Sequence, residues 1–159
     1  MLFRSATTYT GTGSSLAITN TVSSTSFKPD LVWIKSRSAA TDNTVYDSVR
    51  GAQSRLETNN TDAQVTSDGG LTSFDTSGFT VSTLAQVNTN TATYVAWQWQ
   101  AGQGTTSSNT SGSITSTVSV NATAGFSVVT YTANNTAGAT VGHGLGVTPS
   151  FIKIGRAHV

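Results

Sequence analysis

The amino-acid sequence predicts an all-β fold. The first observation is composition, because 30 Thr, 22 Ser, 15 Gly and 10 Asn account for 77 of the 159 residues. Thr, Val and the aromatic residues favour strands, whereas Gly, Asn and Ser favour turns. The second observation is periodicity: apolar and polar residues alternate in several short segments, and no segment of ten or more residues has a convincing helical period. We therefore expect short strands joined by turns.

The charged residues exclude two further classes of protein. Eight Lys and Arg against seven Asp and Glu leave a net charge of +1, too little for a protein that neutralises nucleic-acid phosphates. One Glu and three Lys are also too few for a long helical bundle. Residues 76–152 contain no charged side chain at all. A surface solvated by hydroxyls and amides is typical of extracellular fibres, adhesins and virion proteins.

Several kinds of site and segment have no sequence signature. The absence of Cys excludes disulfides, thiolate metal sites and cysteine nucleophiles. No apolar run approaches the roughly 20 residues of a membrane helix, and the opening MLFRSATTYT lacks the apolar region of a signal peptide. We therefore expect neither membrane insertion nor a nucleic-acid partner.

Residues 1–100 are expected to form a β-sandwich domain. Its opening, TTYTGTGSSLAIT, predicts a hairpin with its turn at Gly11 and Gly13. The apolar run that follows Pro29 predicts a strand with Trp33 in the core. The stretch GGLTSFDTSGFTV alternates and contains two turn signals, so it predicts two further strands.

The segment TVYDSVRGA predicts a strand and then a turn. Asp47 and Arg50 flank this turn, where the carboxylate can accept backbone N–H groups and the guanidinium can reach back to it. We expect at most one short helix in the domain, around residues 48–56. The cations of this region are offset by nearby carboxylates, which favours ion pairs over a nucleic-acid patch.

The segment TATYVAWQWQ is the clearest strand. Its alternation places Val95, Trp97 and Trp99 on one face, opposite Tyr94, Ala96, Gln98 and Gln100. Two interpretations remain open for the tryptophan face. It can face the core of the sandwich, which is the favoured reading, or it can be an exposed platform on which a sugar ring stacks. Trp97 and Trp99 are therefore the candidate ligand-binding residues.

A linker and a partial repeat follow. Residues 101–113 contain no large apolar side chain and predict a flexible linker. Residues 114–153 contain AGFSVVTYTANNTAG, which repeats the opening, and GVTPSFIKI, which echoes FKPDLVWIK. The offset is 122 from Tyr9 to Tyr131 and 120 from Pro29 to Pro149. We therefore expect 114–153 to be the truncated start of a second β domain.

The last six residues, Ile-Gly-Arg-Ala-His-Val, match the translation of a common sequencing-library adapter, ATC GGA AGA GCA CAC GTC. In this frame the preceding AG completes a Lys codon, which agrees with Lys153, and the next adapter codon is a stop. We therefore expect residues 154–159 to be a translated adapter at the end of a truncated environmental read.

The residue types needed for catalysis and metal binding are scattered. Outside the adapter-like tail, His143 is the one base for a Ser/His/Asp set, and its Gly neighbours favour a turn. Asp62, Asp68 and Asp75 lack calcium-loop spacing, and a glycosidase pair is permitted but not indicated by Glu57 and the six Asp. We expect no catalytic residue, no metal site and no cofactor.

The ordered set FKPDLVWIKSRS, YDSVRGA, LTSFDTSGFTV, TYVAWQWQAG and VGHGLGVTPSFIKI resembles an uncharacterised domain family of structural and tail-fibre-like proteins of marine tailed phages. The resemblance covers nearly all of the chain before residue 154. In that family a domain that begins with TYT and GHGLG usually follows TYVAWQWQAG, which agrees with the repeat. Family members commonly have a basic residue where Gln100 stands. The resemblance implies no catalytic residue.

Composition and resemblance together predict a non-enzymatic β-sandwich, jelly-roll or concanavalin-like, in a tail-fibre-like structural protein of a phage virion. Its expected location is the virion, an extracellular particle. Its expected partners are other virion proteins, further copies of the chain and glycans of the host surface. Two alternatives stay open: a fragment of a tail-spike carbohydrate-active enzyme, and a bacterial surface adhesin.

Overall fold

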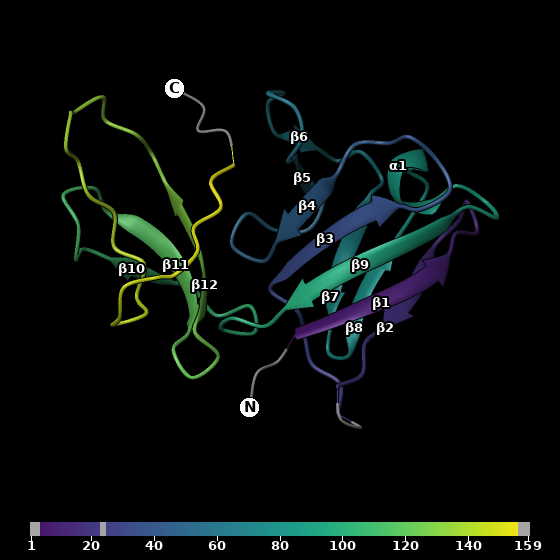
Figure 1. Cartoon of the computed structure of the whole chain (residues 1–159), viewed down its shortest axis with the longest axis horizontal. Helices are drawn as coiled ribbons and strands as arrows, with labels where there is room; N and C mark the ends of the chain where they lie inside the picture. The colour runs from purple at the N-terminus through teal and green to yellow at the C-terminus, as the bar shows by residue number, and fades with distance from the viewer. Residues whose placement is uncertain (1–3, 23–24, 156–159) are drawn as a thin grey trace.

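Two antiparallel sheets form the first part of the molecule (Figure 1). The structure, a computed structural model, describes residues 4–22 and 25–155. The large sheet has six strands in the order β1 (Arg4–Thr10), β9 (Thr93–Trp99), β3 (Leu31–Ser36), β4 (Thr44–Asp47), β5 (Ser54–Glu57) and β6 (Val65–Thr66). The small sheet has the order β2 (Leu16–Thr19), β8 (Gly78–Val81) and β7 (Leu71–Asp75).

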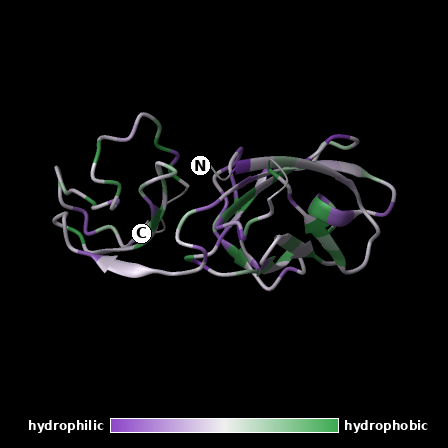
Figure 2. Ribbon diagram, turned by 90° about the horizontal axis from the view of Figure 1, so that it is seen from below, coloured by the Kyte–Doolittle hydropathy of each residue, from purple (hydrophilic) through white to green (hydrophobic). Residues whose placement is uncertain are grey.

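The hydrophobic core lies between these two sheets. Both sheets contribute fully buried side chains, including Val32 and Ile34 from the large sheet and Leu71, Phe79 and Val81 from the small one. Figure 2 shows much of the strongly hydrophobic ribbon around α1 (Ala85–Asn88) and the neighbouring strands. Burial of one face of each sheet is what alternating strands require. The predicted all-β sandwich is therefore confirmed.

The predicted hairpin at Gly11 and Gly13 is wrong. β1 pairs with β9 in the large sheet, whereas β2 pairs with β8 in the small sheet. The turn at these glycines therefore carries the chain from one sheet to the other. It is held by backbone hydrogen bonds from Gly11 N–H to the Ala92 carbonyl and from Gly13 N–H to the Asn88 carbonyl, both 2.8 Å long.

The expectation of a helix around residues 48–56 is also wrong. Within the described residues the helix is α1, and Ser54–Glu57 form β5, which pairs with β4 through Val45 and Leu56. The preceding turn agrees with the prediction. The Asp47 carboxylate accepts the N–H groups of Val49 and Arg50, and Arg50 Nε lies 2.6 Å from Asp47 Oδ2.

The segment expected to be a flexible linker, 101–113, contains ordered elements. It begins with a turn anchored on the fully buried Asp30, whose carboxylate accepts the N–H groups of Ala101, Gln103 and Gly104 at 2.7–2.8 Å. It then forms β10 (Ser107–Asn109). Short polar side chains do not prevent this segment from forming a strand, because hydrogen bonds to a neighbouring strand satisfy the backbone N–H and C=O groups of the segment.

A third sheet follows, with β10 next to β11 (Ser116–Asn121) and β11 next to β12 (Phe126–Tyr131). Beyond β12 the chain has no further strand within the described residues, although Val141 forms a parallel bridge with Ile114. Several large apolar side chains here are exposed, namely Tyr131, Val147, Phe151 and Ile152. Of the adapter-like residues 154–159, only 154–155 are described, and 156–159 lie outside the described residues.

Candidate functional site on the outer face of the large sheet

The tryptophans of β3 and β9 lie on the outer face of the large sheet. β3 and β9 are antiparallel neighbours, and their register places Trp33 directly opposite Trp97. The two rings lie 5.8 Å apart at an angle of 56°. The buried positions of β9 are the alternate ones, Tyr94, Ala96 and Gln98. The alternation was predicted correctly, but the expectation that the tryptophans face the core is wrong.

A buried amide network explains why Gln98 rather than a tryptophan faces the core. Asn20 Nδ2 donates to Gln98 Oε1 at 2.8 Å, and Gln98 Nε2 donates to Thr7 Oγ1 at 3.1 Å. Asn20 also binds the backbone of Phe27 through both its amide atoms. Because the polar groups of Gln98 are satisfied, its burial carries no large desolvation cost.

The three tryptophans differ in how much of each ring is open. Trp97 is 37% exposed. Trp99 is half-buried and stacks on Phe126 of β12, with ring centroids 6.1 Å apart and an interplanar angle of 17°. Trp33 is half-buried, and the Lys153 ammonium lies 4.8 Å from its ring centroid. Of the two candidate residues, Trp97 is therefore the one that can accept a stacked ligand without displacing another ring.

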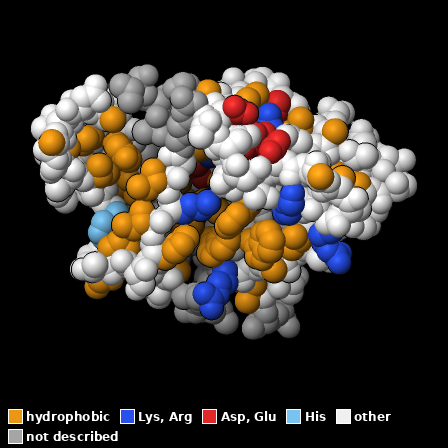
Figure 3. Space-filling view, turned by 45° about the horizontal axis from the view of Figure 1, so that its top comes forward, with side chains coloured by type: hydrophobic (Ala, Val, Ile, Leu, Met, Phe, Trp, Pro, Cys, Tyr) orange, Lys and Arg blue, Asp and Glu red, His pale blue; other side chains and the backbone are white. Residues whose placement is uncertain are grey.

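Cationic side chains border the tryptophans. Arg4 on β1 is exposed and lies opposite Trp99 in the register, while Lys35 on β3 lies opposite Val95. Lys35 Nζ donates to the Thr41 carbonyl, which leaves two of its three N–H donors unused by that bond. Figure 3 shows hydrophobic side chains gathered on the side of the molecule in view, with Lys and Arg among them. The outer surface of β1, β9 and β3 around Trp33, Trp97 and Trp99 is called the tryptophan face below.

The carboxylates of the first domain are mostly occupied elsewhere. Arg55 on β5 contacts Glu57 and also Asp68, whose Oδ2 lies 2.6 Å from Arg55 Nε in an ion pair without hydrogen-bond alignment. Burial alone would raise the pKa of Glu57, but hydrogen bonds from Arg55, Asn60 and Gln86 outweigh it and hold that pKa below its usual range. These groups form a buried ionic cluster that ties residues 58–70, which include β6, to β5.

The other predicted turn carboxylates do not converge. Asp75 accepts hydrogen bonds from the hydroxyls of Ser73 and Thr80, both 2.7 Å long, and Asp62 lies on an exposed loop. Within the described residues no three His, Cys, Asp or Glu side chains gather where a metal ion could bind. No helix in the described part of the chain is long and apolar enough to cross a membrane.

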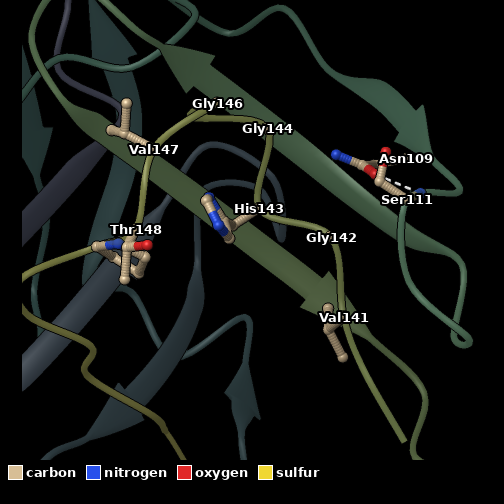
Figure 4. Close-up of a pocket in the computed structure, with 10 residues that line it drawn as sticks. Asn109, Ser111, Val141, Gly142, His143, Gly144, Gly146, Val147 and Thr148 are labelled. Atoms are coloured by element: carbon tan, nitrogen blue, oxygen red, sulfur yellow. Dashed lines mark hydrogen bonds between the residues drawn. The ribbon is translucent and has the colours of Figure 1, made fainter.

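His143 lines an open hollow of about 590 Å³ beside β10 (Figure 4). Its Nδ1 accepts the N–H of Leu145 at 3.2 Å, which is the turn role that its glycine neighbours predict. Asn109 faces the same hollow, and its Oδ1 accepts the N–H of Ser111 at 2.9 Å. His143 is the one titratable side chain among the residues that line the hollow, so no described group is placed there to act as its acid–base partner.

The sequence reasoning missed the role of Asp30. Its carboxylate accepts the Ser48 hydroxyl at 2.6 Å in addition to the three N–H groups of the 101–104 turn. The position of Asp30 directly before β3 gives no local signal for partners 71 to 74 residues away.

Comparison with known proteins gives a family. The chain has no significant match among the curated proteins, and none among the solved structures. A model described as "Domain of unknown function (DUF7483)" matches residues 2–158, which is nearly the whole chain and includes both the sandwich and the third sheet. The chain therefore belongs to the DUF7483 family.

Proposed function

We propose that the chain is part of a tail-fibre-like structural protein of a phage virion and contributes to attachment to glycans of the host surface. The observation that carries the attachment role is Trp97, an indole 37% exposed on the outer face of a sheet. An apolar ring face with a polar surround is suited to the C–H face of a sugar ring. In this proposal the chain binds but does not catalyse, and its location is the virion.

The composition of the surface supports the virion assignment. Residues 76–152 carry no charged side chain, so much of the molecule is solvated by hydroxyl and amide groups alone. Such a surface has little charge for salt to screen, which suits an extracellular particle. The resemblance to tail-fibre-like phage proteins points in the same direction. Other virion proteins and further copies of the chain are the proposed assembly partners.

The tail-spike enzyme is the less favoured alternative. Glycoside hydrolysis uses two carboxyl groups that flank the scissile bond. Glu57 and Asp68 both contact the Arg55 guanidinium, and Glu57 and Asp42 both accept a hydrogen bond from Gln86 Nε2, so these neighbouring carboxylates are held by internal partners. A bacterial adhesin would use the same tryptophan face, so glycan binding does not distinguish an adhesin from a virion protein. The neighbouring genes do: tail and capsid genes support the virion protein, and surface-export genes support the adhesin.

A glycan array tests the attachment role. We expect the protein to bind a subset of bacterial surface polysaccharides, and Trp97→Ala to reduce that binding at least about fivefold, since aromatic contacts are worth about 1 kcal/mol. The matched control is Tyr131→Ala, which removes an aromatic side chain of similar exposure, 40%, from β12. Equal loss in both variants, or no binding by the unmodified protein, would contradict the proposal.

A further inference from the structure

We infer that the tryptophan face selects anionic polysaccharides, in which sulfate or carboxylate groups are attached to the sugar rings. This inference rests on the proposed glycan attachment and names the class of glycan. It is carried by the charges that surround Trp97, which the stacking argument does not use.

The cations of the tryptophan face lie on both sides of Trp97. Arg4 stands opposite Trp99 on one neighbouring strand, and Lys35 stands opposite Val95 on the other. These two positions are four residues apart along β9, or about 13 Å. Trp97 lies midway between them along β9. A sugar chain that stacks on Trp97 therefore passes between two cationic side chains.

Two further cations extend the positive charge. Arg37 follows β3, is exposed, and continues the ladder through a hydrogen bond from its N–H to the Thr93 carbonyl. Lys153 lies over the ring of Trp33. The ion pairs among the described residues involve Arg50 and Arg55. Within that part of the chain, neither Arg4 nor Arg37 therefore has a carboxylate within ion-pair distance. Their guanidinium groups are available to an external anion.

The carboxylate of Asp47, on the outer side of the large sheet, is already neutralised. Asp47 of β4 lies opposite Leu31 in the register and so belongs to the outer side of the sheet. Its carboxylate accepts two backbone N–H groups and pairs with Arg50, and its side chain is only 7% exposed. Glu57 does not belong to this face, because the register aligns it with Thr44 and, through Thr44, with the core residue Ile34. Asp68 contacts the same Arg55 guanidinium as Glu57. The tryptophan face therefore presents uncompensated positive charge, although the whole chain is almost neutral.

The ligand class follows from combining the ring with the charges. A neutral glycan would satisfy Trp97 but leave the guanidinium groups of Arg4 and Arg37 unused. A polyanion without rings would satisfy the guanidinium groups but gain nothing from the indole. Sulfated or carboxylated polysaccharides supply both, since guanidinium binds the planar or tetrahedral oxyanion through paired N–H donors.

Binding to dextran sulfate and to unmodified dextran tests the inference, because the two polymers share one backbone and differ in sulfate. Biolayer interferometry on the full chain should show binding to dextran sulfate at least about tenfold tighter than to dextran. This binding should weaken strongly between 0.1 M and 1 M NaCl, where the Debye length falls from about 10 Å to about 3 Å. Polyphosphate, a polyanion without sugar rings, completes the set of probes.

The variants separate charge on this face from net charge. Arg4→Gln and Arg37→Gln should each weaken dextran sulfate binding about fivefold, the effect of losing one ion pair worth about 1 kcal/mol. Thr76→Glu lowers the net charge by the same amount on the exposed turn between β7 and β8, and it should leave binding unchanged. Trp97→Ala should weaken binding to dextran sulfate but not to polyphosphate.

Each contrary result has a distinct meaning. Equal affinity for dextran and dextran sulfate would overturn the anionic class and leave glycan attachment standing. An equal effect of Thr76→Glu and Arg4→Gln, or polyphosphate binding as tight as dextran sulfate binding, would reduce the observation to general charge attraction and overturn the inference. Binding to neutral glycans on the array without binding to dextran sulfate would also overturn the inference. No detectable binding to the array or to either dextran would overturn the proposed function as well.

Discussion

Buried polar residues connect segments of this molecule that lie far apart in the sequence. Arg55 joins β5 to Asp68 in the turn between β6 and β7, and Gln86 of α1 donates to both Asp42 and Glu57. Arg55 and Glu57 are each about one-tenth exposed at the side chain. Breaking such a cluster by removing one charge leaves the partner charge buried and uncompensated, which is more damaging than the loss of an exposed ion pair.

Glu57 gives this cluster a pH dependence. Its hydrogen bonds hold its pKa below the usual range, so the native state stabilises the ionised form. The stabilisation is complete above the ordinary glutamate pKa of about 4.3. Below that pH the unfolded chain binds a proton before the native state does, and stability falls until the pH has passed the lowered native pKa. We therefore expect Glu57→Gln to be less stable than the unmodified chain at pH 7, with the difference shrinking as the pH falls below about 4.

Urea unfolding between pH 3 and pH 7 measures this difference directly. Asp62→Asn is the matched control, because it makes the same carboxylate-to-amide change on an exposed loop. Its stability should follow that of the unmodified chain at every pH. A difference between Glu57→Gln and the unmodified chain that stays constant from pH 7 to pH 3 would contradict the assignment.

At the scale of secondary-structure elements, periodicity predicted the strands but not which face of β9 is buried. The alternation of TATYVAWQWQ fixes two faces, and hydrophobicity alone favours the tryptophan face as the core. The structure buries the other face because Gln98 finds partners in Asn20 and Thr7, which are 78 and 91 residues away along the chain. Phe126 meanwhile covers part of the outer face by stacking on Trp99. None of these three partners, Asn20, Thr7 and Phe126, can be identified from the local sequence of β9.

At the turn between β1 and β2, too, the sequence predicts the local structure but not the long-range strand pairing. The glycines predicted a turn, but the pairing partners of β1 and β2 are set by β9 and β8, which come much later. Gly11 is needed there because the chain passes very close to the carbonyl oxygen of Thr89. Gly13 is needed for a different reason, a φ of 71°, which residues other than glycine adopt at a cost.

Two substitutions in this turn separate crowding from backbone strain. Gly11→Ala should lower the free energy of unfolding by about 2 kcal/mol or more, because its Cβ would overlap Thr89 backbone atoms that cannot move independently of α1. Gly13→Ala should cost about 1 kcal/mol, because its Cβ would lie 3.6 Å from Asn90 Cβ, an ordinary contact, and only the φ is unfavourable. Urea unfolding of both variants measures the two costs. Equal costs, or a larger cost at Gly13, would show that the turn is not crowded at Gly11.

At the scale of the whole molecule, the two copies of the repeated sequence are packed differently. Tyr9 lies against the core and donates its hydroxyl to the Val87 carbonyl at 2.7 Å, and burial raises the pKa of that hydroxyl. Tyr131, at the equivalent place in the repeat, is 40% exposed. Val32 in the first copy is fully buried, whereas Ile152, three residues after Pro149 as Val32 is after Pro29, is 68% exposed. The same sequence pattern thus builds a core only where a second sheet covers it.

The main hydrophobic cluster is formed by the first part of the chain. Every residue of the main hydrophobic cluster lies between Tyr9 and Ala96. The third sheet touches the sandwich through a few contacts, which include Trp99 with Phe126 and a hydrogen bond from Gly102 N–H to Ser119 Oγ. The turn at 101–104 belongs with the sandwich, because it supplies three of the hydrogen bonds to buried Asp30.

Shortened chains test this division of the molecule. A chain of residues 1–106 keeps the turn, so we expect it to unfold cooperatively in urea with a midpoint close to that of the full chain. Its tryptophan emission should shift to longer wavelength, because Phe126 no longer covers Trp99 and Lys153 no longer covers Trp33. A chain of residues 1–100 loses all three N–H donors to Asp30, and leaving that carboxylate buried without them should cost roughly 3 kcal/mol or more. If the two shortened chains were equally stable, the turn would not be part of the sandwich; if 1–106 did not unfold cooperatively, the third sheet would be required for the fold.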